Sequence, residues 1–430
     1  MIIVDQALEK LEKTNNPIKV GIVGAGFMSK GLVDQIINQT PGMKVVAISN
    51  RTIKNARGNY EFAGIKNYVT VKTSKDLDTA IKNNKPAITE DYLVLCESKN
   101  VDVIVDMTGA VEFGANVALE SIKNKKHIVS MNVELDGTVG SILKRKAEKA
   151  SVIYTLTGGD QPGVILDLFR YVEGIGLKPV LAGNVKGLHD PYRNPATQAA
   201  FAKKWKQKAE MVTSFADGTK ISFEQAVVAN ATGMIVGKRG MYGPAVEVGT
   251  PIENAWKSYS NKSLNTKEGI VDYIVGVYPA GGVFVIAKAK KSTQKHYLSY
   301  YKLGDGPFYT FYTPYHICHF EVPSSIARAV LFNDITIAPL NKPMVDVVAV
   351  AKKDIKRGEV IDGLGGFATY GLCENYKTAR KENLLPIGLA QGCFAKKDIK
   401  KDQVIKFSDV ILPEGRLIDK LWQEQLSVFN

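Results

Sequence analysis

Two lysines follow apolar or turn segments at places that suit carbonyl chemistry. Lys186 ends an apolar segment and leads into Gly-Leu-His-Asp, and Lys220 follows the turn Asp217-Gly218 and precedes Glu224 by four residues. A cation or acid held at such a place can stabilise the alkoxide that develops when a carbonyl is reduced. We therefore interpret Lys186, Lys220 and Glu224 as candidate catalytic residues, with a solvated strand end as the alternative for each lysine.

Two loops concentrate polar side chains that can bind a substrate. Asp190 and Arg193 lie in Asp-Pro-Tyr-Arg-Asn-Pro, and an arginine there can bind a phosphate or a carboxylate. Asp160 lies in Gly-Gly-Asp-Gln-Pro, where two domains are expected to meet. It can orient the substrate, bind a divalent metal or cap a helix.

His316 and His319 are three residues apart, a spacing that metal ligands use on a helix. The segment 308–320 has the composition of a strand, however, where a spacing of three places side chains on opposite faces. We therefore predict that His316, beside Tyr315, contacts the substrate and takes part in catalysis. The need for a divalent metal stays open.

The segment Gly24-Ala-Gly26-Phe27-Met28-Ser29 carries two glycines of the dinucleotide-binding fingerprint. It follows a predicted strand at 18–24 and opens a predicted helix at 29–39. Gly24 permits the tight turn, and Gly26 lets the backbone approach a pyrophosphate at the helix N-terminus. The strand, turn and helix together predict a bound nicotinamide cofactor.

The next predicted strand, 43–49, ends in Ser-Asn50-Arg51-Thr52 and has no acidic residue there. Enzymes that use NAD usually place Asp or Glu at this point, to accept a hydrogen bond from the ribose 2′-hydroxyl. Arg51 can instead pair with a 2′-phosphate. The sequence therefore predicts NADP(H) in preference to NAD(H).

Two further strands, 101–107 and 127–131, end in polar residues. Ligands bind outside the carboxyl ends of parallel strands, so Thr108, Gly109, Asn132 and Glu134 are expected to line the nicotinamide side. Asp106 is interpreted as a turn-capping acid.

Strands that alternate with helices predict an α/β, doubly wound Rossmann domain over residues 1–155. Residues 156–323 are expected to form an α+β catalytic domain with an antiparallel sheet, including a hairpin whose strands, 211–215 and 220–223, flank Asp217-Gly218. A helix at 324–332 should lead back to the Rossmann domain, within a return segment at about 324–340. The segment 348–361 is echoed by 393–405, which predicts a small all-β domain at 345–430.

Composition excludes several classes of protein. The net charge is +13, but the lysines are scattered among Asp and Asn, which argues against nucleic acid as a partner. No apolar stretch is long enough for a membrane span. The four cysteines form no Cys-x-x-Cys pair, so a cytoplasmic location is expected.

Several strings together resemble a known family: Gly24-Ala-Gly, Met131-Asn-Val-Glu, Gly159-Asp, Asp217-Gly-Thr-Lys, Ala229-Asn230-Ala-Thr-Gly, Gly306-Pro-Phe-Tyr-Thr-Phe, Pro314-Tyr-His and Ala351-Lys-Lys-Asp. They resemble the homoserine-dehydrogenase-like oxidoreductases with a C-terminal SAF (β-clip) domain, whose members include DRL-type enzymes similar to 1-deoxy-D-xylulose 5-phosphate reductoisomerase. The resemblance implies NADPH-linked Rossmann, catalytic and SAF domains in that order, and homo-oligomers. Asn230 and Tyr315 lie in the shared strings and are expected to bind substrate.

Three hypotheses follow. The first is an NADP-dependent reductase or reductoisomerase of a phosphorylated sugar or polyol. The second keeps hydride transfer and changes the substrate to an amino-acid semialdehyde or a sugar acid. The third is a non-catalytic sensor that binds a dinucleotide. The segments 185–195 and Gln161-Pro-Gly depart from the reductoisomerase-like pattern, so isomerisation stays open.

Overall fold

The computed structural model describes residues 2–429, and the chain divides into two compact units. The first unit contains Met1–Asp160, Ile317–Ala338 and Leu417–Asn430. The second contains Gln161–His316 and Pro339–Arg416. No helix among the described residues is long and apolar enough to cross a membrane.

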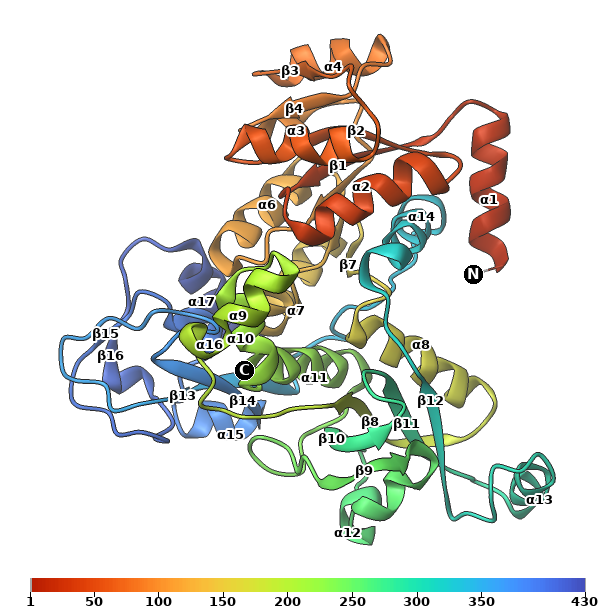
Figure 1. Ribbon diagram of the computed structural model, residues 1–430, viewed down its shortest axis with the longest axis vertical. Helices are drawn as coiled ribbons and strands as arrows, with labels where there is room; N and C mark the ends of the chain where they lie inside the picture. Colours follow the sequence, from red (N-terminus) through yellow and green to blue (C-terminus); the bar gives the residue numbers. More distant parts are fainter. Residues whose placement is uncertain (1, 430) are drawn as a thin grey trace. The chain divides into compact units, whose positions relative to one another are not determined.

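The first unit is built on a seven-stranded parallel sheet with the order β3-β4-β2-β1-β5-β6-β7 (Figure 1). Its strands are β1 (Ile18–Val23), β2 (Met43–Ser49), β3 (Val69–Thr70), β4 (Ala87–Thr89), β5 (Val103–Asp106), β6 (His127–Ser130) and β7 (Tyr154–Leu156). The central strands are almost wholly buried because helices cover both faces. The predicted doubly wound Rossmann fold is therefore confirmed.

Two hydrophobic clusters, one on each face, hold the helices against this sheet. The helices are α1 (Ile2–Lys13), α2 (Phe27–Gln39), α3 (Ile53–Phe62), α4 (Ser74–Lys82), α5 (Leu93–Glu97), α6 (Val111–Lys123), α7 (Val133–Lys149), the 3-10 turn η2 (Cys318–Glu321), α14 (Val322–Phe332) and α17 (Leu417–Phe429). One cluster joins α1, α2, α3 and α14 to β1, and the other joins α4, α5 and α6 to β2 and β5. The later segment α14 thus completes the core of the first unit.

A side chain of α17 forms hydrogen bonds with backbone groups of α7 at a point where the helical hydrogen bond is missing. Val139 has non-helical angles (φ −136°, ψ 16°), which opens the bond that Ile142 N–H would make to the Thr138 carbonyl. The buried amide of Gln425 bridges this gap, since its Oε1 accepts from Ile142 N–H at 3.2 Å and its Nε2 donates to the Thr138 carbonyl at 3.0 Å. The kink in α7 is therefore fixed by the C-terminal helix.

Replacing Gln425 by leucine should lower the free energy of unfolding by about 1–3 kcal/mol, because two buried backbone groups lose their partners. Urea denaturation measures the change. Gln423→Leu, an exposed position of the same helix, is the matched control and should change stability little. Equal stability of the two variants would show that α7 closes the break by itself.

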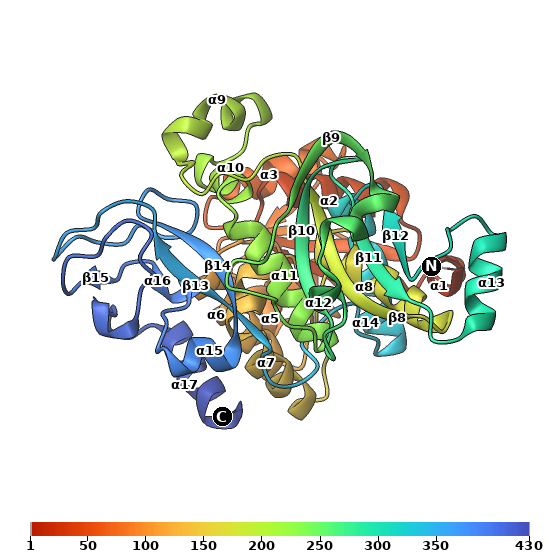
Figure 2. The same cartoon turned by 90° about the horizontal axis from the view of Figure 1, so that it is seen from below.

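The second unit contains a five-stranded mixed sheet with the order β12-β11-β8-β10-β9 (Figure 2). The strands are β8 (Lys178–Lys186), β9 (Ala245–Pro251), β10 (Ile270–Tyr278), β11 (Val283–Lys288) and β12 (Phe308–Thr313). The first three run parallel, and β11 is antiparallel to both its neighbours. The strands predicted at 269–277 and 282–290 are confirmed, but the sheet is not purely antiparallel as expected.

The other elements of this unit are α8 (Gln161–Gly174), α9 (Pro195–Trp205), α10 (Ala209–Ala216), α11 (Thr219–Thr232), η1 (Ile252–Ser258), α12 (Asn261–Leu264), α13 (Ser292–Tyr300), β13 (Val345–Ala351), β14 (Thr369–Asn375), α15 (Tyr376–Lys381), α16 (Ile387–Ala390), β15 (Phe394–Ala395), η3 (Phe407–Asp409) and β16 (Val410–Ile411).

The prediction of a hairpin at 211–223 is wrong, because α10 and α11 occupy this segment. Gly218 (φ +88°) is the N-cap of α11, and Asp217 accepts from Thr219 N–H at 2.8 Å. The dipeptide ends one helix and starts the next. Nearly every residue of α11 is buried, so it shows no helical periodicity.

The two copies of the C-terminal internal repeat, the echo at 348–361 and 393–405, cap each other through their aspartates. Asp354 accepts from Lys401 N–H, and Asp398 accepts from Arg357 N–H, both at 2.9 Å. Ile355 pairs with Ile399 in an antiparallel bridge. The predicted small β unit is present as the strand pairs β13–β14 and β15–β16, with the short helices α15 and α16 between them.

Candidate active site

The glycine-rich turn after β1 leaves a helix N-terminus open. Gly24 has a φ of +101°, and a Cβ there would lie 2.9 Å from the Met107 carbonyl group, so only glycine fits. Gly26 is the N-cap of α2, no side chain among residues 2–429 caps this end, and a Cβ on Gly26 would meet no described atom within 4 Å. Phe27 is exposed and Met28 half-buried. The turn therefore fits the pyrophosphate of a dinucleotide.

The end of β2 is fastened to this turn by Asn50. Its Oδ1 accepts from Ala25 N–H at 3.1 Å, and its Nδ2 donates to the Thr52 carbonyl at 2.9 Å. Arg51 and Thr52 are both exposed, and Arg51 forms no ion pair with any described residue. Asn50 thus shapes the site, while Arg51 and Thr52 can reach a ligand.

A buried carboxylate organises the ends of β5 and β6. Asp106 accepts from the Thr108 hydroxyl at 2.6 Å and from the Ser130 hydroxyl at 3.2 Å. Asn132 is fully buried, donates to the Ala110 carbonyl and accepts from Leu135 N–H. Burial raises the pKa of Asp106, and these hydrogen bonds oppose the rise.

These contacts refine the expected nicotinamide side. Asp106 has the turn-holding role predicted for it. Asn132 was expected to face the cofactor, but its side chain is used within the fold. Thr108 and Gly109 are partly exposed at the same sheet edge, and Glu134 is buried in the first turn of α7.

The segment after β12 does not continue as a strand, contrary to the prediction for 308–320. The strand ends at Thr313, before a proline. His319 lies against Gly31 of α2, where a Cβ would be 2.6 Å from its Nε2, and Cys318 N–H donates to the Gly159 carbonyl at 2.8 Å. His316 belongs to the second unit and His319 to the first. No group of three His, Cys, Asp or Glu side chains that could hold a metal occurs within residues 2–429. Asp160, next to Gly159, is buried.

The second unit contains a buried polar network centred on Asn184 of β8. Its Nδ2 donates to the side-chain oxygen of Gln161 and to Glu224 Oε2, the latter at 2.9 Å, and its Oδ1 accepts from Gln225 Nε2 at 2.7 Å. All four side chains are buried. The network therefore holds the Glu224 carboxylate in one place.

His316 adjoins this network. Its Nδ1 lies 2.8 Å from the Gly281 carbonyl oxygen and 3.5 Å from Gln161 Nε2. A carbonyl oxygen only accepts, so Nδ1 carries the hydrogen and Nε2 is the basic nitrogen of the neutral ring. Tyr315, the neighbouring residue, is exposed.

The two candidate lysines lie between two contact points of antiparallel segments. Asn184 meets Glu224 at one point, and Asp190 N–H donates to the Ala216 carbonyl at the other. Asp190 lies in the loop after β8 and Ala216 ends α10, so the segments 184–190 and 216–224 run in opposite directions. Lys186 and Lys220 lie on these two segments between the two contact points.

The environment of Lys186 agrees with this placement. Lys186 shares a strand face with Asn184 two residues before it. It makes no hydrogen bond or ion pair with the residues that the structure describes. Burial and then the positive charge of Lys186 lower the pKa of His189, which packs against Gly218. A charged group thus lies beside the start of α11.

Three expected substrate residues are used within the fold. Asp190 pairs with Arg193 Nε at 3.0 Å, which leaves the terminal guanidinium nitrogens of Arg193 as its remaining donors. Asn230 was expected to bind substrate. Its buried side chain instead accepts from Met344 and Val345 N–H and fastens α11 to β13.

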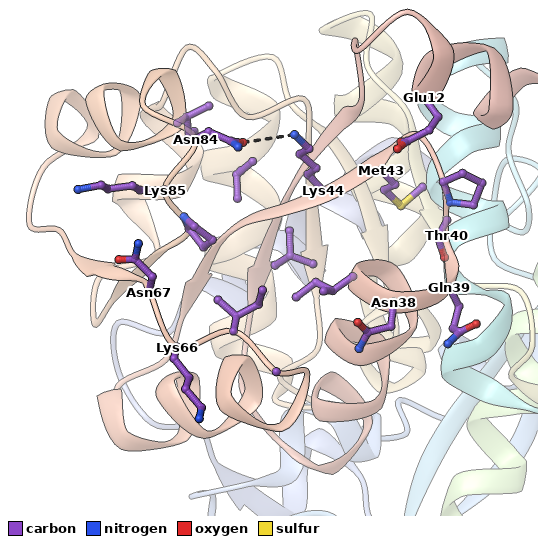
Figure 3. A pocket seen from close by; sticks show the side chains of 18 residues that line it. Glu12, Asn38, Gln39, Thr40, Met43, Lys44, Lys66, Asn67, Asn84 and Lys85 are labelled. Atoms are coloured by element: carbon purple, nitrogen blue, oxygen red, sulfur yellow. Dashed lines mark hydrogen bonds between the residues drawn. The ribbon is translucent and has the colours of Figure 1, made fainter.

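A cavity of about 820 Å³ lies elsewhere, at the amino edge of the first sheet (Figure 3). It is surrounded by the C-terminal ends of α2, α3 and α4, and Lys44 Nζ donates to Asn84 Oδ1 at 3.3 Å there. Lysines at helix C-termini offset the helix dipoles. Ligands of such sheets bind at the opposite edge, so we assign this cavity no part in the chemistry.

Three parts of the chain match known protein families. Residues 159–322 match the family described as oxidoreductase DRL, catalytic domain. Residues 24–155 match the NAD-binding domain of homoserine dehydrogenase, and residues 346–411 match the SAF domain. The three kinds of domain that the motifs suggested are thus each matched, in the expected order. The resemblance stated from the motifs is confirmed, and the protein is an NAD(P)-dependent oxidoreductase.

More distant similarity appears among solved structures. A probable dehydrogenase from Thermotoga maritima is 13% identical, with a TM-score of 0.41 over 75% of this chain and 91% of that one. A scyllo-inositol dehydrogenase from Lactobacillus casei, with bound NAD(H) and scyllo-inositol, is 12% identical, with a TM-score of 0.33 over 96% and 88%. At these values the likeness carries no argument about substrate. None of the curated proteins matches this chain in sequence.

Proposed function

We propose that the protein is an NADP-dependent oxidoreductase that transfers hydride to or from a small, hydroxylated and phosphorylated sugar or polyol. The observation that carries this proposal is the buried network in which Asn184, two residues before Lys186 on β8, holds Glu224, four residues after Lys220 on α11. Two cations next to a fixed carboxylate suit a substrate whose oxygen becomes an alkoxide. Isomerisation linked to the hydride transfer is part of the first hypothesis and rests on family resemblance.

Each side chain has a role in this proposal. A nicotinamide cofactor, when bound, supplies or accepts the hydride. Lys186 and Lys220 hold the substrate carbonyl oxygen and stabilise the negative charge that develops on it. Glu224, held by Asn184, exchanges a proton with the substrate hydroxyl. His316 presents its basic Nε2 to a second hydroxyl, and Arg193 binds the phosphate through its terminal nitrogens.

The choice of NADP rests on the end of β2. Arg51 is exposed and free of ion pairs with the described residues, and Thr52 offers a hydroxyl beside it. The alternative substrates, an amino-acid semialdehyde or a sugar acid, lack the phosphate that Arg193 would bind. Asp160 and Tyr315 as substrate contacts, a cytoplasmic location and a homo-oligomeric state stay predictions.

Replacing Arg51 by alanine should weaken NADPH binding about 10- to 100-fold and leave NADH binding nearly unchanged, since only NADPH carries the 2′-phosphate. Calorimetric titration with each nucleotide measures the difference. Arg57→Ala, a change to an exposed arginine in the second turn of α3, is the control. Equal loss for both nucleotides would contradict the NADP assignment.

Titration with NADPH and NADH, each with and without deoxyxylulose phosphate, tests the function. Tight NADPH binding that strengthens with the sugar phosphate is the expected result, followed by NADPH oxidation in an activity assay. An affinity for NADPH that is the same with and without deoxyxylulose phosphate would favour the semialdehyde or sugar-acid substrates. Tight NADPH binding without oxidation by a broad panel of carbonyl compounds would favour the dinucleotide sensor.

A further inference from the structure

Lys352 is a buried lysine that none of the catalytic roles above uses. Only 5% of its surface is exposed. Its ammonium group donates three hydrogen bonds, to Asp217 Oδ2 at 2.9 Å, to the Arg193 carbonyl at 2.7 Å and to the Gly366 carbonyl at 2.8 Å. An ammonium group has three hydrogens, so every donor is satisfied.

These bonds join the SAF region to both segments that carry the candidate lysines. Arg193 lies in the loop that follows Lys186, and Asp217 is fully buried at the start of α11, three residues before Lys220. Gly366 belongs to the SAF region itself. Lys352 therefore contacts both segments that carry a candidate lysine, one through the Arg193 backbone carbonyl and the other through the Asp217 carboxylate.

A second contact fastens the same loop. The Tyr192 hydroxyl donates to the Asp402 carboxylate at 3.0 Å, and the ammonium of Lys401 lies 3.6 Å from the centre of the Tyr192 ring. Asp402 and Lys401 belong to the second copy of the echo. Both copies thus contribute to holding the loop.

The internal echo supplies a comparison within the chain. Lys352 of the first copy corresponds to Lys396 of the second, in Ala-Lys-Lys-Asp-Ile at 351–355 and 395–399. Lys396 is exposed, and its side chain makes no hydrogen bond or ion pair within residues 2–429. The β unit therefore does not need a buried lysine at this place for its own fold. The burial of Lys352 serves the contact with Asp217 and Arg193.

We propose that Lys352 is a positioning residue, through which the SAF region fixes the spacing between the loop 187–194 and the start of α11, and so holds Lys186 and Lys220 in register. This inference rests on the proposed role of those two lysines. A small displacement of a catalytic group can cost about 100-fold in rate. The SAF region would then be needed for turnover without touching the substrate.

The test compares Lys352→Met with Lys396→Met in the full-length protein. Lys352→Met should lower kcat about 10- to 100-fold, leave the dissociation constant of NADPH unchanged, and increase amide hydrogen exchange in residues 188–194. Lys396→Met should change none of these. The double variant Lys352→Met, Asp217→Asn removes the uncompensated buried charge and should restore thermal stability, but neither kcat nor exchange protection.

Recovery of both kcat and exchange protection in the double variant would overturn the proposal, because Lys352 would then only neutralise Asp217. An unchanged kcat and unchanged exchange in Lys352→Met would overturn it as well. The exchange measurement needs no substrate. If the wild-type protein fails to turn over sugar phosphates, the proposed function fails, while the effect of Lys352 on the loop is still decided by exchange.

Discussion

Replacing Lys186 by methionine should lower kcat for hydride transfer by about 100- to 1,000-fold while leaving cofactor binding unchanged. Methionine keeps the length and apolar stem of the side chain and removes the charge. The loss should appear in kcat more than in KM, because the ammonium group acts on the oxygen that becomes charged in the transition state.

The second unit supplies the reason for this expectation. Asn184 and Lys186 lie on one face of β8, and Asn184 holds the Glu224 carboxylate of α11. Lys220 lies one helical turn before Glu224 on the same helix. A positive group there can approach a substrate oxygen, and a water molecule that took its place would carry no charge to stabilise the alkoxide.

Lys178→Met is the matched control, because Lys178 lies at the exposed opposite end of the same strand and donates to the Lys267 carbonyl. It should leave kcat unchanged. Absorbance of the reduced nicotinamide follows the reaction. If Lys186→Met turned over at the wild-type rate on an authentic substrate, the catalytic assignment would be wrong, and Lys220→Met would test whether the other lysine acts alone.

The cofactor turn could be predicted from sequence because its chemistry is local. Gly24 and Gly26 lie within a few residues of the strand and helix they join, and the structure places them at the carboxyl end of β1 as expected. Arg51 is local in the same sense. Backbone geometry alone decides these positions.

The network in the second unit could not be predicted in full, because its members come together only through tertiary structure. Gln161, Asn184 and Gln225 were not candidates, although Asn184 stands two residues before Lys186 and therefore shares its strand face. Asn230 looked like a substrate residue because it lies in a shared string. Its string is instead fixed by the contact with β13, 115 residues away.

Dependence on tertiary structure also explains why a hairpin was wrongly predicted at 211–223. Asp217-Gly218 suits a hairpin when the flanking residues form strands, and short apolar runs do not distinguish a strand from a buried helix. Burial of α11 on all sides is a property of the whole unit. Lys352, which lies 135 residues from Asp217, is a further consequence of that packing.

Asp136→Asn should remove a dependence of stability on pH that is built into the first unit. Asp136 lies in α7 and is 2% exposed, and neither of its carboxylate oxygens makes a well-formed hydrogen bond with a described residue. Burial raises the pKa of Asp136 to about 7, and the neighbouring Tyr154 hydroxyl offsets a part of this. The folded protein therefore keeps the proton at pH values where the unfolded chain has lost it.

The direction of the effect follows from proton binding. The ordinary pKa of this carboxyl is 3.8, so between about pH 4 and pH 7 the unfolded state binds fewer protons than the folded state. Stability then falls as the pH rises through this window, by up to about 4 kcal/mol in total, and is independent of this group above pH 7. Asparagine stays neutral throughout and should keep the stability that aspartate loses.

Denaturation in urea at pH 4.5 and pH 8 measures the difference. The variant and the wild type should be nearly equal at the lower pH, and the variant should be more stable at the higher pH by up to about 4 kcal/mol. Asp5→Asn, an exposed position on α1, controls for loss of a surface charge and should leave the pH dependence intact. A variant that is less stable at pH 8 than the wild type would show that the Asp136 carboxylate is ionised and paired in the fold, so that its charge stabilises α7 against β7 instead of opposing their packing.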